Sequence, residues 1–124
     1  MKLGLSVSGD NGSHDVACIR FGEGRGLEKF QLNPKHTKLY FTQNNTDYAV
    51  VRSASEGEMT VNFKPETNGT YTINVNAENM EMQYLHLIDN LTGTNIDLLQ
   101  TPTYSFEAKV SDDAARFTLV FIRK

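Results

Sequence analysis

The sequence predicts an all-β protein, built as a single antiparallel β-sandwich of the immunoglobulin-like or jelly-roll-like kind. Short runs of alternating apolar and polar residues recur along the chain, separated by turn-forming residues about every 8–12 positions. Ala is scarce, and no stretch has apolar residues at the period of an amphipathic helix. The 124 residues, 39% of them hydrophobic, suffice for one core, so we expect 1–124 to be a single β-sandwich domain.

The predicted strands follow one another in order. The first run alternates Leu3, Leu5 and Val7 with polar or small residues and ends in the turn at 9–13. Such alternation indicates half-buried strands, because successive side chains of a strand face opposite sides of the sheet. The same pattern recurs at 59–63, 71–75, 85–87, 96–98, 104–108 and 117–121.

Three segments between these runs are expected to adopt different structures. Residues 64–69 predict a hairpin turn, because the Asn68-Gly69 pair adopts positive φ readily. In the turn at 89–94, we expect Asp89 to accept a hydrogen bond from the amide two residues on and Gly93 to be left-handed. Residues 22–45 lack clear alternation and predict an irregular segment with one short helical turn around 34–38.

Composition excludes several classes of protein. The net charge of −3 and the lack of a basic stripe argue against nucleic-acid binding. No apolar run approaches the ~18–20 residues of a transmembrane helix. The single cysteine, Cys18, lies in the apolar run Val16-Ala17-Cys18-Ile19 and is expected to be a small buried hydrophobic residue.

No recognisable catalytic pattern is present. The glycines at 22, 24 and 26 are not followed by a helix pattern or a Lys-Ser/Thr pair, so they predict a loop and not a phosphate site. No Ser lies in a Gly-x-Ser-x-Gly elbow, and His14, His36 and His86 match no catalytic signature. We expect His86 to face outward between Leu85 and Leu87. The sequence therefore predicts a protein that is not an enzyme, with no catalytic residues and no cofactor.

Two pairs of residues are candidate ligand sites. Asp10 and Asp15 belong to a segment that is similar to oxygen-rich calcium loops, although the EF-hand spacing fails, and a solvated hairpin turn is the alternative. Tyr48 and Tyr84 are candidates for stacking on sugar rings, although strand tyrosines commonly pack across strands and the chain has no Trp. The pair Asp112-Asp113 predicts a turn before the last strand.

Several motifs resemble one family along nearly the whole chain. Residues 15–24 read D-V-A-C-I-R-F-G-E-G, 69–73 read G-T-Y-T-I, 87–94 read L-I-D-N-L-T-G-T, 104–106 read Y-S-F and 116–121 read R-F-T-L-V-F. In this order they resemble a β-sandwich module found near the C-termini of large secreted and cell-surface proteins of Bacteroidetes. The segment 30–39 departs from that family: Lys38 fits, but the acidic positions are lost.

The resemblance implies a non-catalytic module of a secreted or cell-surface bacterial protein, acting as a structural spacer or a protein-interaction domain. Its partners would be other domains of a larger parent protein or envelope proteins. The alternative is a carbohydrate-binding module that binds glycan through outward aromatic residues or end loops. Residues 1–7 alternate like a strand and do not form a signal peptide, so we expect any export signal to lie outside this chain.

Overall fold

The computed structural model describes residues 2–29, 36–78 and 80–124. In these residues the backbone forms strands and turns and no helix, which confirms the all-β prediction. No described segment could therefore cross a membrane as an apolar helix. The strands are β1 (Lys2–Gly9), β2 (His14–Phe21), β3 (Leu27–Glu28), β4 (Lys38–Gln43), β5 (Thr46–Ser53), β6 (Glu56–Lys64), β7 (Gly69–Glu78), β8 (Met82–Asp89), β9 (Thr94–Asp97), β10 (Thr103–Ala108) and β11 (Phe117–Arg123).

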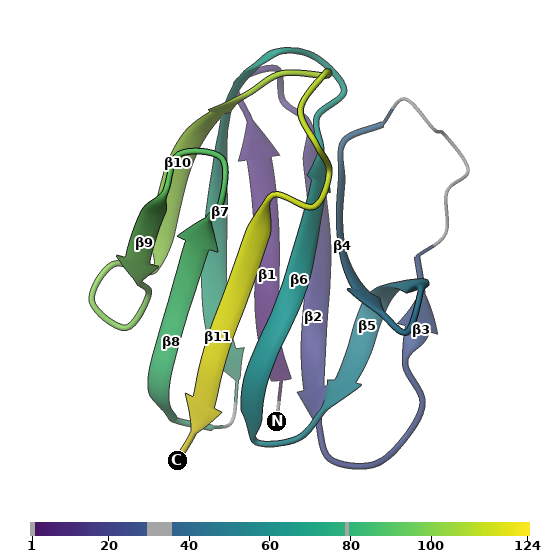
Figure 1. Cartoon of the computed structure of the whole chain (residues 1–124), viewed down its shortest axis with the longest axis vertical. Coiled ribbons are helices and arrows are strands. Elements are labelled where there is room, and N and C mark those ends of the chain that lie inside the picture. The colour runs from purple at the N-terminus through teal and green to yellow at the C-terminus, as the bar shows by residue number, and fades with distance from the viewer. Residues whose placement is uncertain (1, 30–35, 79) are drawn as a thin grey trace.

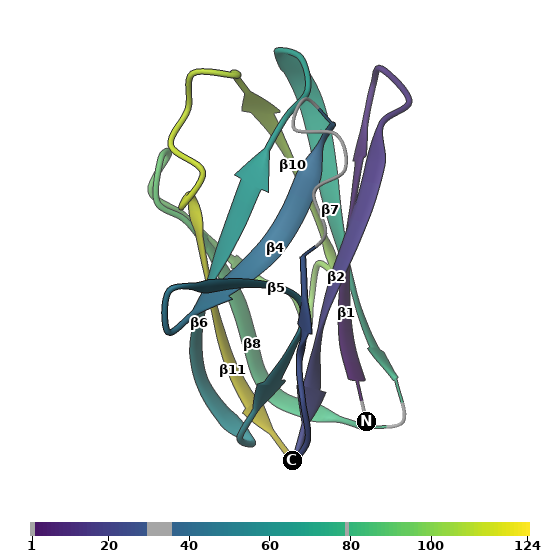
Figure 2. The same cartoon turned by 90° about the vertical axis from the view of Figure 1, so that its right-hand side faces the viewer.

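The strands form one continuous sheet in the order β10-β7-β1-β2-β5-β4-β6-β11-β8-β9, with β3 paired to β5 (Figure 1). The sheet wraps round so that β1, β2 and β7 lie on one side and β6, β8 and β11 on the other (Figure 2). It is mostly closed and barrel-like. The strand pairing thus gives one wrapped sheet, where the sequence predicted the two separate sheets of a sandwich.

The expectation of a purely antiparallel arrangement is wrong at one pair, because β2 and β5 run parallel, with Cys18 opposite Val50 and Phe21 opposite Ser53. A parallel pair needs a long crossover between its strands. The segment 22–45 supplies it and contains β3 and β4. Of the helical turn predicted around 34–38, residues 34 and 35 lie outside the described residues; 36–38 are not helical, and Lys38 begins β4.

The hairpin predicted at 64–69 is wrong. Strand β6 pairs with β4 and β11, whereas β7 pairs with β1 and β10, so this connection crosses from one side of the molecule to the other. Neither Asn68 nor Gly69 adopts positive φ. Instead, the Asn68 side-chain oxygen accepts a hydrogen bond from the Val110 amide at 2.7 Å, and Tyr71 Oη donates to the Thr67 carbonyl at 2.8 Å. Tertiary contacts therefore decide the shape of this loop.

Two other predicted turns are confirmed. The turn predicted at 9–13 joins the antiparallel strands β1 and β2; Gly9 is still the last residue of β1, and Gly12 has a φ of 84°. The turn at 89–94 joins β8 and β9. As expected, the Leu91 amide donates to Asp89 Oδ1 at 3.1 Å, and Gly93 has a φ of 74°.

The core lies between the two sides of the wrapped sheet. Most inward positions of the predicted strands are buried, whereas Val75, Ile96 and Tyr104 are partly buried against the core. Each large apolar side chain that is fully buried contributes about 1.5–3 kcal/mol. Phe63, Tyr71, Phe106 and Phe117 form an aromatic cluster with centroid separations of 5.0–6.4 Å. The largest fully buried side chains are Tyr71, Phe41, Phe117, Phe121, Leu3, Leu5, Ile19, Leu39, Ile73, Leu87, Leu119 and Val7.

Candidate functional site

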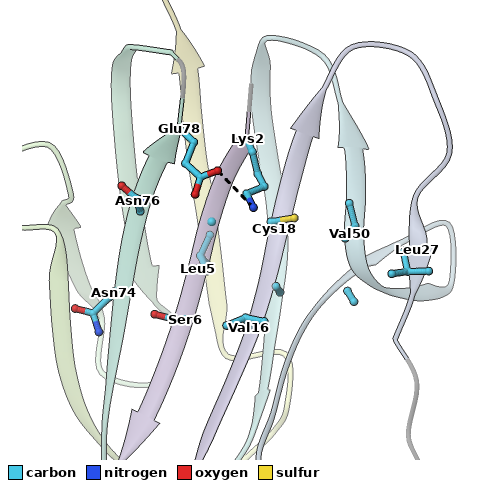
Figure 3. A pocket seen from close by; sticks show the side chains of 13 residues that line it. Lys2, Leu5, Ser6, Val16, Cys18, Leu27, Val50, Asn74, Asn76 and Glu78 are labelled. Carbon is cyan, nitrogen blue, oxygen red and sulfur yellow. Dashed lines mark ion pairs between the residues drawn. The ribbon is translucent and has the colours of Figure 1, made fainter.

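A groove of about 460 Å³ runs over the outer face of β7, β1, β2 and β5 (Figure 3). It follows from strand alternation: Leu3, Leu5 and Val7 point into the core, so the residues between them face outward. Two of these are Gly4 and Ser6, which fill little space above the sheet. The middle of this face is therefore hollow.

Apolar side chains form one wall of the groove. Val16 and Cys18 project outward from β2, and Val50 and Leu27 lie beside them on β5 and β3. Val16 is 53% exposed and Leu27 is 62% exposed, although both are large apolar residues. Leu27 reaches this position because β3 pairs with β5, where Leu27 stands opposite Val50. The groove thus exposes apolar surface that the described residues leave uncovered.

The opposite wall is polar and comes from β7. Asn74 and Asn76 project from this strand on the side away from Leu27 and Val50 (Figure 3). Within the described part of the chain, neither amide makes a side-chain hydrogen bond. At the end of the groove, Lys2 Nζ lies 3.4 Å from a carboxylate oxygen of Glu78. The groove therefore offers free amide donors and acceptors facing an apolar wall.

Cys18 lies in this groove and not in the core, so the prediction of a buried hydrophobic residue is wrong. Ala17 and Ile19 take the inward positions of β2, which leaves Cys18 outward and half-buried. Burial raises the pKa of the Cys18 thiol, and the nearby cations Lys2 and Arg20 oppose that shift without cancelling it. The thiol is therefore protonated at neutral pH and is a poor nucleophile.

The two acidic candidates for a cation site occupy different surroundings. Asp10 is exposed in the turn between β1 and β2. Asp15 Oδ2 lies 2.6 Å from Lys29 Nζ and accepts a hydrogen bond from the Leu39 amide at 2.8 Å, which ties β2 to β4. Among the residues that the structure describes, no three His, Cys, Asp or Glu side chains gather as a metal site. A cation at Asp10 or Asp15 stays a prediction.

The two candidate tyrosines lie on different strands. Tyr48, on β5, is half-buried and packs against the core beside Gly26. Tyr84 is 39% exposed on the outer face of β8 and stacks on His86, with 4.3 Å between ring centroids. His86 faces outward as expected, and its Nδ1 lies 2.7 Å from Asn95 Oδ1 on β9. Of the two, Tyr84 is the more exposed, and His86 covers one face of its ring.

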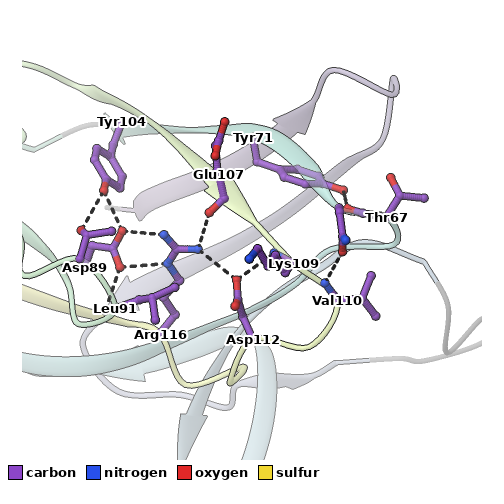
Figure 4. A network of polar contacts seen from close by, with 12 residues as sticks. Thr67, Tyr71, Asp89, Leu91, Tyr104, Glu107, Lys109, Val110, Asp112 and Arg116 are labelled. Carbon is purple, nitrogen blue, oxygen red and sulfur yellow. Dashed lines mark hydrogen bonds and ion pairs between the residues drawn. The ribbon is translucent and has the colours of Figure 1, made fainter.

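A buried polar network links the strands at the open edge of the sheet (Figure 4). The Arg116 guanidinium donates to both carboxylate oxygens of Asp89 at 2.9 Å and to the Glu107 carbonyl of β10 at 2.9 Å. Tyr104 Oη, also from β10, donates to Asp89 Oδ2 at 2.7 Å. The network holds β10 against β8 and against the segment before β11.

The electrostatics of this network are those of a structural ion pair. Burial alone would raise the pKa of Asp89, but hydrogen bonds from Arg116 and Tyr104 outweigh it and hold the pKa below its usual range. The carboxylate is fully buried, so it has no access to a substrate. Asp112 also approaches the guanidinium, 3.7 Å from Nη1, in the predicted turn before the last strand.

Sequence reasoning missed the groove residues. They come from five strands, and only the strand order brings them to one face. One signal was present: the run Val16-Ala17-Cys18-Ile19 is apolar on both faces of its strand, which indicates a partly covered outer face. Comparison with known proteins finds no matching family model, curated protein or solved structure.

Proposed function

We propose that this protein is a non-catalytic protein-interaction module that binds a segment of a partner protein in the groove over β7, β1, β2 and β5. The observation that carries the proposal is the apolar wall formed by the exposed Val16 and Leu27 and the half-buried Val50, because exposed apolar patches mark interaction sites. We further propose that the module belongs to a secreted or cell-surface bacterial protein, related to the β-sandwich modules that its motifs resemble. In that protein the module would also act as a structural spacer between neighbouring domains.

An extended peptide suits this groove. Its alternate side chains project to one side, so they can lie against the apolar wall while the backbone passes over Gly4 and Ser6. The free amides of Asn74 and Asn76 can then hydrogen-bond the backbone of the peptide. A volume of about 460 Å³ has room for a few side chains.

The test is a selection from a displayed library of random peptides on the whole protein, followed by affinity measurements on the enriched peptides. We expect these peptides to lose about tenfold or more in affinity with Leu27→Glu or Val16→Glu. The matched controls are Leu91→Glu and Val110→Glu, since Leu91 is 58% exposed and Val110 is 61% exposed outside the groove. No enrichment, or equal binding by the groove and control variants, would refute the proposal.

The second candidate function is carbohydrate binding at Tyr84. The observation that favours it is the exposed ring of Tyr84 stacked on His86, next to the polar groups of Asn95 and Asp97 on β9. A glycan array probed with and without calcium tests this function and the cation candidates together. Reproducible binding that Tyr84→Ala abolishes would support it, whereas binding unaffected by Tyr84→Ala would exclude this surface.

A further inference from the structure

Three basic residues form a row at one end of the groove. Strand register places Lys2 of β1 opposite Arg20 of β2, and Arg20 opposite Arg52 of β5. All three project outward, because Leu3, Ile19 and Val51 occupy the inward positions next to them. We call Lys2, Arg20 and Arg52 the cation row.

The cation row is only partly neutralised by this chain. Lys2 pairs with Glu78 at 3.4 Å. Arg52 Nε donates to the neutral Arg25 carbonyl at 3.3 Å, and no carboxylate of the described ranges forms an ion pair with Arg52. Arg20 is exposed and makes neither a hydrogen bond nor an ion pair among the described residues. The protein as a whole carries a net charge of −3. A positive row on an acidic protein is a local feature that attracts anions.

The cation row borders the apolar part of the groove. Arg20 follows Cys18 by two residues on the same face of β2, and Arg52 follows Val50 in the same way on β5. Lys2 itself lines the groove together with Cys18 and Val50. An apolar surface and a positive edge are therefore contiguous.

We propose that the partner segment bound in the groove is an extended acidic peptide, whose apolar side chains lie against Val16, Leu27 and Val50 while its carboxylates meet the cation row. The inference rests on the proposed function and adds the chemical class of the partner. Charge complementarity carries it, because opposite charges across an interface speed association and reject partners of the wrong sign. A basic or neutral segment would leave Arg20 without a counter-charge.

The probes are three synthetic peptides with the same alternating Leu and Val positions. The positions between are Ser in all three peptides, because alternate side chains of an extended peptide point away from the groove. A short segment at the end nearest the cation row is all Asp in the first peptide, all Ser in the second and all Lys in the third. We expect the Asp peptide to bind about tenfold more tightly than the Ser peptide at about 50 mM NaCl, and the Lys peptide to bind most weakly. The advantage of the Asp peptide should shrink at about 500 mM NaCl, since salt screens exposed charges.

Charge reversal identifies the residues responsible. Arg20→Glu should abolish the preference for the Asp peptide and leave binding of the Ser peptide within about twofold. Lys109→Glu is the matched control, because Lys109 is exposed and lies far from the cation row. The residue before it, Ala108, pairs with Gly69 at the start of β7, whereas Lys2 pairs with Glu78 at the end of β7. Equal loss of Asp-peptide affinity in both variants would overturn the inference.

The outcomes separate this inference from the proposed function. The display selection can yield peptides whose binding requires Leu27 but which show no excess of Asp or Glu. That result would overturn the inference of an acidic partner and would still support the proposed interaction module. If dodecanoate binds in the groove and the Asp peptide does not, the groove binds an amphipathic anion and not an acidic peptide, and the inference is overturned. Peptides from the selection that are rich in acidic residues and lose affinity with Arg20→Glu would support it.

Discussion

Asp89 and Arg116 carry opposite charges in a place where water cannot reach them. Asp89 is 0% exposed and Arg116 is 4% exposed. Charges buried in this way are tolerated only when their hydrogen-bonding groups find partners. Here the carboxylate accepts bonds from Arg116, Tyr104 and the Leu91 amide, so the two residues depend on each other.

We expect Arg116→Leu to lower the free energy of unfolding by about 3–5 kcal/mol, because it leaves the Asp89 carboxylate buried without its counter-ion. Denaturant unfolding of the purified protein measures this. Tyr104→Phe, which removes one hydrogen bond from the same carboxylate, should lose only about 1–2 kcal/mol. A loss below about 1 kcal/mol for Arg116→Leu would contradict this account of the network.

The lowered pKa of Asp89 predicts a loss of stability in acid. The unfolded carboxyl titrates at about 3.9, and the folded one titrates below that, so its contribution is fully present above the unfolded pKa. That contribution disappears as the pH falls through the folded pKa. Between about pH 5 and pH 2, the denaturation midpoint of the wild type should fall more steeply than that of Asp89→Asn. Equal pH dependence of the denaturation midpoint in the two proteins would argue against a lowered pKa of Asp89.

At the scale of strands, the turn between β4 and β5, which the sequence did not predict, differs from the two confirmed turns. Asn44 and Asn45 both adopt positive φ, at 53° and 63°, whereas the turns at 9–13 and 89–94 use a glycine for this purpose. Asn tolerates this conformation better than most residues, but glycine adopts it without steric strain. The preferred sequence for a two-residue hairpin loop of this kind is Asn-Gly.

Asn45→Gly is therefore expected to raise the free energy of unfolding by up to about 1 kcal/mol. Gly93→Ala is the control and should have the opposite effect. The space around Gly93 is open, but its φ of 74° strains a residue that has a side chain, so we expect the free energy of unfolding to fall by about 1 kcal/mol. Thermal and denaturant unfolding of both variants measure the pair. Destabilisation by Asn45→Gly would show that the turn gains nothing from glycine.

Sequence reasoning was most successful where structure depends on neighbouring residues. Alternation identified the buried face at Leu3, Leu5 and Val7, and the turn at 89–94 followed from Asp89 and Gly93. It failed at 64–69, where Asn68-Gly69 matches a hairpin signal. There the Asn68 side chain instead bonds the Val110 amide, 42 residues away in the chain, which no local pattern encodes.

At the scale of the whole molecule, the strand order joins parts of the chain that are far apart. Strand β1 pairs with β7, and β6 pairs with β11, so most of the sheet forms only after long loops have closed. The parallel pair of β2 and β5 also needs its crossover in place. Closing such loops before contacts form slows folding.

We therefore expect refolding from denaturant to take about milliseconds to seconds at 25 °C, as for other proteins dominated by non-local strand pairs. Stopped-flow measurement can follow it through tyrosine fluorescence, since the chain has five Tyr and no Trp. Refolding within microseconds would mean that local structure dominates the barrier. In that case the sheet order would have little influence on the rate.

The groove shows why the candidate site was harder to predict than the fold class. Each wall residue could be assigned an outward position from its own strand, but the groove exists only because β7, β1, β2, β5 and β3 are neighbours. The cation row has the same origin, since Lys2, Arg20 and Arg52 are separated by 18 or more positions and meet only through strand register. Register between distant strands is a tertiary property.

The sequence by itself determined the all-β class, the inward face of most strands and two of the turns, because alternation and turn chemistry act over a few residues. Only the tertiary structure decided that one wrapped, mixed sheet forms, that Cys18 lies in a groove, and that Asp89 pairs with Arg116. These features depend on which distant strands become neighbours. That choice is made by packing of the whole core and not by any local segment.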